Sequence, residues 1–270
     1  AYLAYQTAFL KCHYTKEYMA ALMSSVLDYT DKLIEYVDEC RKNNIKVLKP
    51  DINKSSAYFT SEENGIRYGL LAIKTLGMGV ISGILKERDE NGEFINLQDF
   101  CSRTAEIGVS KVSVEYLIKS GAFDGLGANR RQMISNYEFL MDSASDFSKS
   151  NLDGQMGLFS EENSPTAVDV EFKPEEEYRY ADLLCFEKFA TGMYISGHPA
   201  DPYKTALKLM HIPDALHVQS NLKEGAYTKN QVISFLGAMD DITVKYTSTG
   251  KKMGFLTLQD LSLIHISEPT

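Results

Sequence analysis

The stretch Leu76-Gly77-Met78-Gly79 separates two apolar runs, Leu70–Ile73 and Val80–Leu85. A second glycine-rich stretch, Gly121–Gly127, separates two further runs with apolar residues at helical spacing. Paired glycines between helices permit positive φ angles and the close approach of another backbone. The pattern predicts two helix-hairpin-helix units, which would pack as a compact pair. The expected core residues are Ile81, Ile84, Leu117, Ile118, Met133 and Ile134.

A helix that starts directly after such a hairpin has unpaired backbone N–H groups and the positive end of its dipole facing outward, which suits an anion. We therefore predict that the hairpins bind the sugar-phosphate backbone of DNA without reading bases. In the alternative interpretation, the glycines only end helices and form turns. Lys86, Arg88 and Lys119 would add screened charge. The predicted backbone-binding residues are Lys74, Gly77, Met78, Gly79, Gly121, Gly125, Gly127, Arg130 and Arg131.

The chain has a formal net charge of −9, but this charge is unevenly distributed. Residues 153–187 contain ten acidic and two basic residues, a net charge of −8. Residues 65–131 contain nine basic and eight acidic residues, a net charge of +1. The hairpin region is therefore not repelled by its own charge, and backbone amides are the main predicted contact with DNA.

The four cysteines, Cys12, Cys40, Cys101 and Cys185, lie far apart and form no C-x-x-C pair. This spacing predicts neither a disulfide framework nor a zinc site and fits a reducing cytoplasm. No apolar run is long enough to predict a membrane span, and no signal-peptide pattern is present. Ser196 and His198 do not predict catalysis, because no acid is positioned to orient them and Gly-His-Pro is a common turn.

Residues 1–65 are expected to be mostly helical, with Thr15 capping a second helix. A β-hairpin is expected from Ala57–Thr60 and Ile66–Gly69. In the following module, residues 66–142, Asn96 and Ser110 are expected to cap helices. Residues 143–175 have the composition of an acidic linker, apart from an apolar island in the sequence Gln155-Met156-Gly157-Leu158-Phe159. Its leucine and phenylalanine either fold back on the domain or dock in a partner's pocket.

A helix is expected to resume at Glu176, within a helical connector of residues 176–222. In residues 223–260, Val232–Asp241 and Met253–Gln259 predict two antiparallel strands with a basic tip. Two strands cannot close a barrel, so this module is expected to be incomplete. Residues 261–270 could add a third strand or be a non-native ending. Possible contacts to single-stranded DNA are Phe235, Tyr246, Lys251, Lys252 and Phe255.

Several of these stretches resemble the bacterial DNA polymerase III alpha subunit, the family C replicative polymerase, up to about Asp260. The landmarks are Tyr5–Lys11, Tyr36–Arg41, Ile66–Lys74, Leu117–Asp124 and Ser196–Pro199. The resemblance implies a mainly α fold with small β elements. It would comprise the end of the fingers, a tandem helix-hairpin-helix, an acidic linker and a partial OB-fold.

The resemblance also implies partners and a cofactor. Gln155, Met156, Leu158 and Phe159 are similar to the family's internal sliding-clamp-binding motif. The implied partners are primer-template duplex DNA, the sliding clamp and other holoenzyme subunits, with no membrane. The palm carboxylates that hold Mg²⁺ for nucleotidyl transfer would lie before Ala1, so no catalytic or metal-binding residue is expected here.

Two other hypotheses remain open on the sequence. One is a stand-alone DNA-repair or structure-specific DNA-binding protein that uses helix-hairpin-helix units without a polymerase. The other is a protein-interaction scaffold whose hairpins only pack. A palm with paired Asp residues encoded upstream of Ala1 would favour the polymerase, whereas a lack of DNA affinity at low salt would favour the scaffold.

Overall fold

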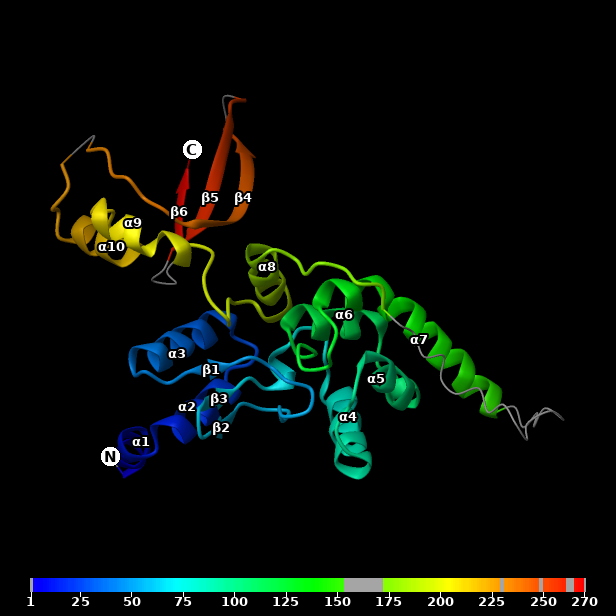
Figure 1. Ribbon diagram of the computed structural model, residues 1–270. Coiled ribbons are helices and arrows are strands. Elements are labelled where there is room, and N and C mark those ends of the chain that lie inside the picture. The colour runs from blue at the N-terminus through cyan, green and yellow to red at the C-terminus, as the bar shows by residue number, and fades with distance from the viewer. Residues whose placement is uncertain (1, 153–171, 229–230, 248–249, 261–264, 270) are drawn as a thin grey trace. The chain divides into compact units, whose positions relative to one another are not determined.

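The computed structural model describes residues 2–152, 172–228, 231–247, 250–260 and 265–269 (Figure 1). The chain divides into two compact units, Ala1–Ser196 and Gly197–Thr270. Helices dominate the first unit, and both units contain a small sheet of three strands. The predicted class, mainly α with small β elements, is confirmed.

The first unit begins with three helices, α1 (Tyr2–His13), α2 (Thr15–Ser24) and α3 (Thr30–Lys42). Helix α1 buries none of its residues, whereas α2 and α3 bury one face each. The predicted cap at Thr15 is wrong. Its hydroxyl donates a hydrogen bond of 2.9 Å to the carbonyl of Lys11 in the preceding helix, so α2 has no side-chain cap.

A small sheet follows, with the strand order β1–β3–β2. Strands β2 (Thr60–Glu62) and β3 (Gly65–Arg67) form an antiparallel hairpin, as predicted, but β2 begins at Thr60, where the predicted first strand ends, so the strand is shifted along the chain. Strand β1 (Val47–Leu48) pairs in parallel with β3 only, so β1 is an edge strand. Strand β1 ends two residues before Pro50, which has no backbone N–H to donate to a neighbouring strand.

The hairpin region contains η1 (Leu70–Ala72), α4 (Met78–Asn91), α5 (Leu97–Thr104), η2 (Ala105–Ile107), α6 (Lys111–Ser120) and α7 (Arg130–Leu152). The predicted caps are confirmed. The Asn96 side chain accepts a hydrogen bond from the backbone N–H of Asp99 at 2.8 Å. The Ser110 hydroxyl accepts a hydrogen bond from the backbone N–H of Ser113 at 3.0 Å. Each glycine-rich stretch therefore leads into a helix, α4 or α7, as the sequence predicts.

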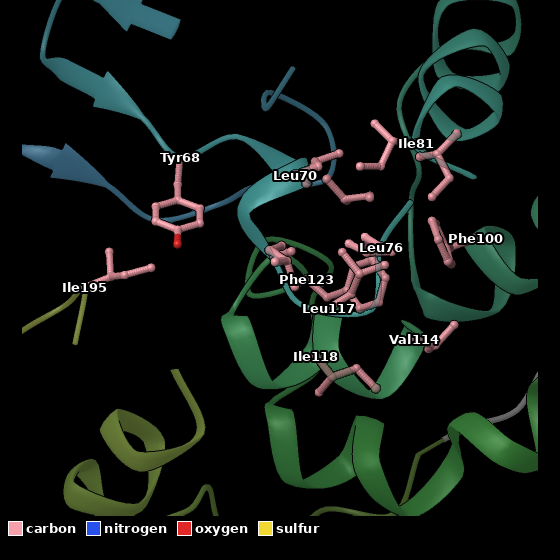
Figure 2. Close-up of a cluster of buried hydrophobic side chains, with 14 of the residues drawn as sticks. Tyr68, Leu70, Leu76, Ile81, Phe100, Val114, Leu117, Ile118, Phe123 and Ile195 are labelled. Carbon is pink, nitrogen blue, oxygen red and sulfur yellow. The ribbon is translucent and has the colours of Figure 1, made fainter. Parts of the chain in front are cut away.

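One hydrophobic core joins α2, α3, the first sheet and the hairpin helices. Figure 2 shows the part of this core around Leu76, Leu117 and Phe123. Phe100 packs against Phe94 and Phe123, with ring centroids 5.0 and 4.8 Å away. The backbone N–H of Ile52 donates to the carbonyl of Ala122 at 2.9 Å, which ties the N-terminal part to the second hairpin. The predicted core residues are buried, except that Ile134 is only partly buried. The proposed division at residue 65 therefore follows the sequence pattern and not a break in the core.

Helix α8 (Tyr180–Thr191) packs against α6 and completes the first unit. It begins at Tyr180 and not at Glu176, so the predicted start is wrong; residues 173–179 have no regular secondary structure. The buried Tyr68 hydroxyl lies 3.4 Å from the Thr191 carbonyl at the end of α8. Burial raises the pKa of this phenol far above its usual value.

The second unit contains η3 (Asp201–Tyr203), α9 (Lys204–Leu209), α10 (Ala215–Lys223), β4 (Ala238–Tyr246), β5 (Lys252–Gln259) and β6 (His265–Pro269). Strands β4 and β5 form the predicted antiparallel pair, although β4 starts at Ala238 and not at Val232. Strand β6 adds a third antiparallel strand on the other edge of β5. The sheet has the order β4–β5–β6.

Candidate nucleic-acid interface

The first hairpin leaves the N-terminus of α4 open. Gly77 is the N-cap residue, and no side chain accepts a hydrogen bond from the first turn. The first helical hydrogen bond of this turn runs from Ile81 to the Gly77 carbonyl at 3.1 Å. The amides of Met78, Gly79 and Val80 therefore precede the helical ladder, as expected at any helix start. They lie at the positive end of the α4 dipole.

The two glycines of this hairpin face open space. A Cβ atom added to Gly77 or Gly79 would meet no atom within 4 Å. Neither residue has a positive φ angle, so a backbone conformation that only glycine tolerates does not explain them. The positive φ of this hairpin lies instead at Thr75, at 70°. What the two glycines provide is an unobstructed approach to the amides of the first turn of α4.

Thr75 is strained, because a β-branched residue rarely adopts a positive φ. The conformation directs its carbonyl to the Ser113 hydroxyl, at 3.3 Å. Leu76 is buried next to it and anchors the hairpin to the core. Lys74 is exposed, but its ammonium donates to the Phe189 carbonyl at 3.1 Å, at the end of α8. The hairpin is thus held in place from α6 and from α8.

The second hairpin differs from the first, because its structure requires a glycine at position 121. Gly121 ends α6 in the left-handed conformation, with a φ of 83°. An added Cβ there would collide with the guanidinium of Arg130 and lie 3.0 Å from an Asp124 carboxylate oxygen. Gly127 also has a φ of 83°, whereas Gly125 has neither a positive φ nor a neighbour within 4 Å of an added Cβ.

The N-terminus of α7 is occupied by a carboxylate of the same chain. Glu177 accepts hydrogen bonds from the backbone N–H groups of Arg130 at 2.9 Å and Arg131 at 3.2 Å. Asn129 and Gln132 cap the same turn reciprocally, each side-chain oxygen accepting from the other's backbone N–H at 2.8 and 3.0 Å. The amides that we predicted to bind phosphate at this hairpin therefore already have acceptors.

Residues 173–178, which we call the acidic strap, lie along the start of α7. The Asn129 amide donates to the Glu175 carbonyl at 2.7 Å, and the Gln132 amide donates to the Lys173 carbonyl at 2.8 Å. The guanidinium of Arg131 lies 3.5 Å from the Glu175 carboxylate. It also lies over the ring of Tyr178, 5.6 Å from the centroid. Arg131 remains half exposed.

Arg130 lies inside the protein, with 4% of its surface exposed. Its guanidinium makes two hydrogen bonds to Asp124, at 2.7 and 2.8 Å, and lies 3.3 Å from Glu187. It also donates to the Lys119 carbonyl at 3.1 Å. Burial alone would raise the pKa of Asp124, but Arg130 and Lys49 hold it below its usual value. The structure therefore places Arg130 in a buried ion network and not at the surface.

The sequence contains a signal for this arrangement. Two arginines begin α7, where the helix dipole disfavours positive charge. A carboxylate nearby offsets this cost, and Glu175-Glu176-Glu177 follows Pro174 just before α8. Glu187, the other carboxylate beside Arg130, also accepts hydrogen bonds from the hydroxyl and N–H of Ser196 at 2.7 and 2.9 Å.

The other predicted contacts lie apart from the hairpins in the chain. Gln155, Met156, Leu158 and Phe159 fall outside the described residues. Lys251 and Lys252 are exposed at the tip of the β4–β5 pair, beside the exposed Tyr246. Phe255 is half-buried, pairs with Thr243 and lies under the ammonium of Lys245, 5.2 Å from the ring centroid. Phe235 precedes β4, so the structure places the two phenylalanines on different parts of the module.

Within the described ranges, no three His, Cys, Asp or Glu side chains are grouped so that they could hold a metal ion. No helix in the same ranges is long and apolar enough to cross a bilayer. The four cysteines are free thiols, and burial raises the pKa of Cys40 to about 11 and that of Cys101 to about 12.

Comparison with known proteins bears on these features directly. The model of a helix-hairpin-helix motif matches residues 44–133, the segment that holds both hairpins. The DNA polymerase III subunit alpha of Borreliella burgdorferi is 36% identical over 261 residues, which is 96% of this chain. The chain matches a segment of the DNA polymerase III alpha subunit. The predicted resemblance is confirmed.

Two further relatives with the same name support the match. The protein from Bacillus subtilis is 35% identical over 255 residues, or 94% of this chain. The protein from Xylella fastidiosa Temecula1 is 39% identical over 210 residues, or 77% of this chain. The chain spans only about a fifth of the length of these relatives, 22%, 22% and 18% respectively. The similarity therefore concerns one region of a much longer DNA polymerase III alpha subunit.

Proposed function

We propose that this region belongs to a replicative DNA-directed DNA polymerase and binds the backbone of primer-template duplex DNA through the first hairpin. The observation that carries the proposal is the open start of α4. Gly77 and Gly79 face empty space without any conformational need for glycine. Room beside the positive end of a helix is what a phosphate oxygen requires to reach backbone amides. The names of the relatives and the helix-hairpin-helix motif support the same function.

The binding would be independent of sequence, since amides at a helix start contact phosphates and not base edges. The region itself is proposed to be non-catalytic, with nucleotidyl transfer and its Mg²⁺ elsewhere in the full-length polymerase. The second hairpin is proposed to support the first, because its own amides are bonded to Glu177.

The test places a side chain in the open space beside Gly79. Gly79→Val is expected to weaken binding to a blunt DNA duplex about 10- to 100-fold, since each lost hydrogen bond to a charged group contributes about 1.5–3 kcal/mol. Binding is measured by fluorescence anisotropy at several salt concentrations and for two unrelated sequences. The loss should be equal for both sequences.

Gly125→Val is the matched control, because Gly125 also has open space and no positive φ but lies in the second hairpin. It should leave the affinity unchanged. If Gly79→Val and Gly125→Val both bind duplex DNA like the unaltered chain, the first hairpin is not the binding site.

We further propose that Gln155, Leu158 and Phe159 attach the polymerase to the sliding clamp. An acidic linker with one glutamine and two apolar anchors is a usual form of peptide ligand. Replacing all three by alanine should abolish capture by the sliding clamp in a pull-down and leave duplex affinity unchanged. Alanine replacements at Asn163, Thr166 and Val168 in the same linker serve as the control, and equal capture by both triple variants would refute the tether.

The hairpin of β4 and β5 is proposed to contact single-stranded DNA through Lys251 and Lys252. Both are exposed at its tip beside the exposed ring of Tyr246, and cations with aromatic rings suit a nucleic-acid strand. This contact would belong to an OB-type module of the full-length protein.

A further inference from the structure

Ser113 is a buried serine near the start of α6, with 4% of its surface exposed. Its backbone N–H donates to the Ser110 hydroxyl, which caps the helix, at 3.0 Å. Its own hydroxyl lies 2.9 Å from that of Ser110 and 3.3 Å from the Thr75 carbonyl in the first hairpin. We propose that Ser113 is a positioning residue that holds the first hairpin in the conformation with an open α4 start. Its role in DNA binding rests on the proposed function of that hairpin.

The direction of these hydrogen bonds follows from the number of hydrogens. A hydroxyl has one hydrogen to donate, and a carbonyl oxygen can only accept. The Ser113 hydrogen therefore points to the Thr75 carbonyl, so the hydrogen between the two hydroxyls belongs to Ser110. The N-cap of α6 and the turn of the first hairpin are thus joined by one directed chain of hydrogen bonds, from Ser110 to Ser113 to Thr75.

The contact between Ser113 and Thr75 is not the ordinary one for a helix start. Ser110 is the N-cap of α6, and Ser113 is the third helical residue. At that position a glutamate or glutamine commonly reaches back to the N-cap backbone, which completes a capping box. The Ser113 hydroxyl instead donates to a carbonyl 38 positions earlier in the chain. The side chain therefore serves the hairpin as well as the helix start.

The turn that Ser113 contacts does not keep its shape by local preference. Thr75 has a φ of 70°, which a β-branched residue rarely adopts. Hydrogen bonds from both sides stabilise it, because the Lys74 N–H donates to the Ala190 carbonyl at 2.9 Å and the Thr75 carbonyl accepts from Ser113. Two residues later, Gly77 begins the open start of α4. With a negative φ at Thr75, the chain would enter α4 by another path and change the approach to its first amides.

Helix α6 also gives the second hairpin a way to support the first. Ser113 lies near one end of α6, and near the other end the Lys119 carbonyl accepts a hydrogen bond from Arg130 at 3.1 Å. The ten residues of α6 extend over about 15 Å, at 1.5 Å per residue. The buried ion network of the second hairpin thus anchors the helix whose first turn positions the other hairpin.

The test removes the hydroxyl with Ser113→Ala and measures the affinity for a blunt duplex by fluorescence anisotropy. The affinity is expected to fall about three- to ten-fold, which corresponds to one hydrogen bond between neutral groups. Adding Thr75→Gly should restore the affinity to within about two-fold of the unaltered chain, because glycine adopts this φ without support. Loss of a serine that only stabilises the fold would not be rescued in this way.

Ser120→Ala is the matched control. Ser120 is a buried serine of the same helix, but its hydroxyl donates within α6 to the Leu117 carbonyl at 2.8 Å. This variant should leave duplex affinity unchanged, and thermal melting verifies that all variants are folded. The amide NMR signals of Gly77 and Gly79 give a reading that needs no DNA. Ser113→Ala should shift both signals, and adding Thr75→Gly should reverse the shift.

Ser113 has no positioning role if Gly79→Val weakens duplex binding and Ser113→Ala does not, if Thr75→Gly does not reverse the loss, or if Ser120→Ala causes an equal loss. The proposed duplex binding fails instead if Gly79→Val leaves the affinity unchanged. The NMR signals of Gly77 and Gly79 then decide the role of Ser113 alone. A shift that Thr75→Gly reverses supports the role, and unshifted signals overturn it.

Discussion

The two hairpins share a sequence pattern but use their glycines in opposite ways. In the first hairpin, Gly77 and Gly79 leave open space beside the start of α4, and the strained positive φ is at Thr75. In the second hairpin, glycine is required at position 121 for two reasons. Its left-handed φ disfavours other residues, and the Arg130 guanidinium leaves no room for a side chain. One helix start is open and the other is bonded to Glu177. A repeated motif can thus occur twice while only one copy keeps an open helix start.

The largest expected effect comes from breaking the ion network of the second hairpin. Arg130→Ala should lower the free energy of unfolding by about 3–5 kcal/mol, because it leaves the buried Glu187 without its cation and leaves Asp124 with Lys49 as its only cation in the described part of the chain. Arg131→Ala, at the half-exposed neighbouring position, should cost under about 1 kcal/mol. Urea unfolding followed by circular dichroism measures both. Similar losses of unfolding free energy for the two variants would show that the buried ion network of Arg130 does not stabilise the fold.

The glycines provide the next test of the contrast. Gly121→Ala should destabilise the protein by about 1–3 kcal/mol, because alanine is strained at this φ and meets Arg130. Gly79→Ala should stabilise it by about 0.5–1 kcal/mol, since alanine is a better helix former and meets nothing there. Denaturation midpoints compare the two. If both changes were destabilising to the same degree, the two hairpins would not differ as described.

The smallest effect concerns the acidic strap. Glu177→Gln removes a charge at the α7 N-terminus that contributes about 0.3–1 kcal/mol. Because the second hairpin is proposed to support the first and not to bind DNA itself, duplex affinity measured by anisotropy should stay unchanged. A rise of about two- to five-fold would show instead that duplex DNA displaces the strap. Glu176→Gln, the exposed neighbour, is the control. Unchanged affinity for Glu177→Gln would make the strap a permanent part of the second hairpin.

Much of the local structure followed from the sequence. Apolar spacing identified the core positions Ile81, Leu117 and Met133, and polar residues before helices identified the caps Asn96 and Ser110. Thr15 failed as a cap because its hydroxyl had a nearer acceptor in the preceding helix. Local patterns are predictable when the partner groups lie within one turn of each other.

The difference between the hairpins could not be predicted in this way. It depends on Glu177, which lies 47 positions after Arg130 and within the helix that the sequence predicts from Glu176. The burial of Arg130 depends on Asp124 and Glu187 together, and Glu187 lies on α8. Basic residues beside glycines indicated surface contacts with DNA, whereas the contacts that bury them arise only when distant segments pack together.

The shared core also has a consequence for how force would pass through the first unit. Ile52 is bonded to Ala122, and Tyr68 is packed between the first sheet and the end of α8. A pull on the first hairpin would therefore reach α2 and α3 through packed side chains. If the first hairpin binds duplex DNA as proposed, the load would be spread over the first unit and not borne by the hairpin alone.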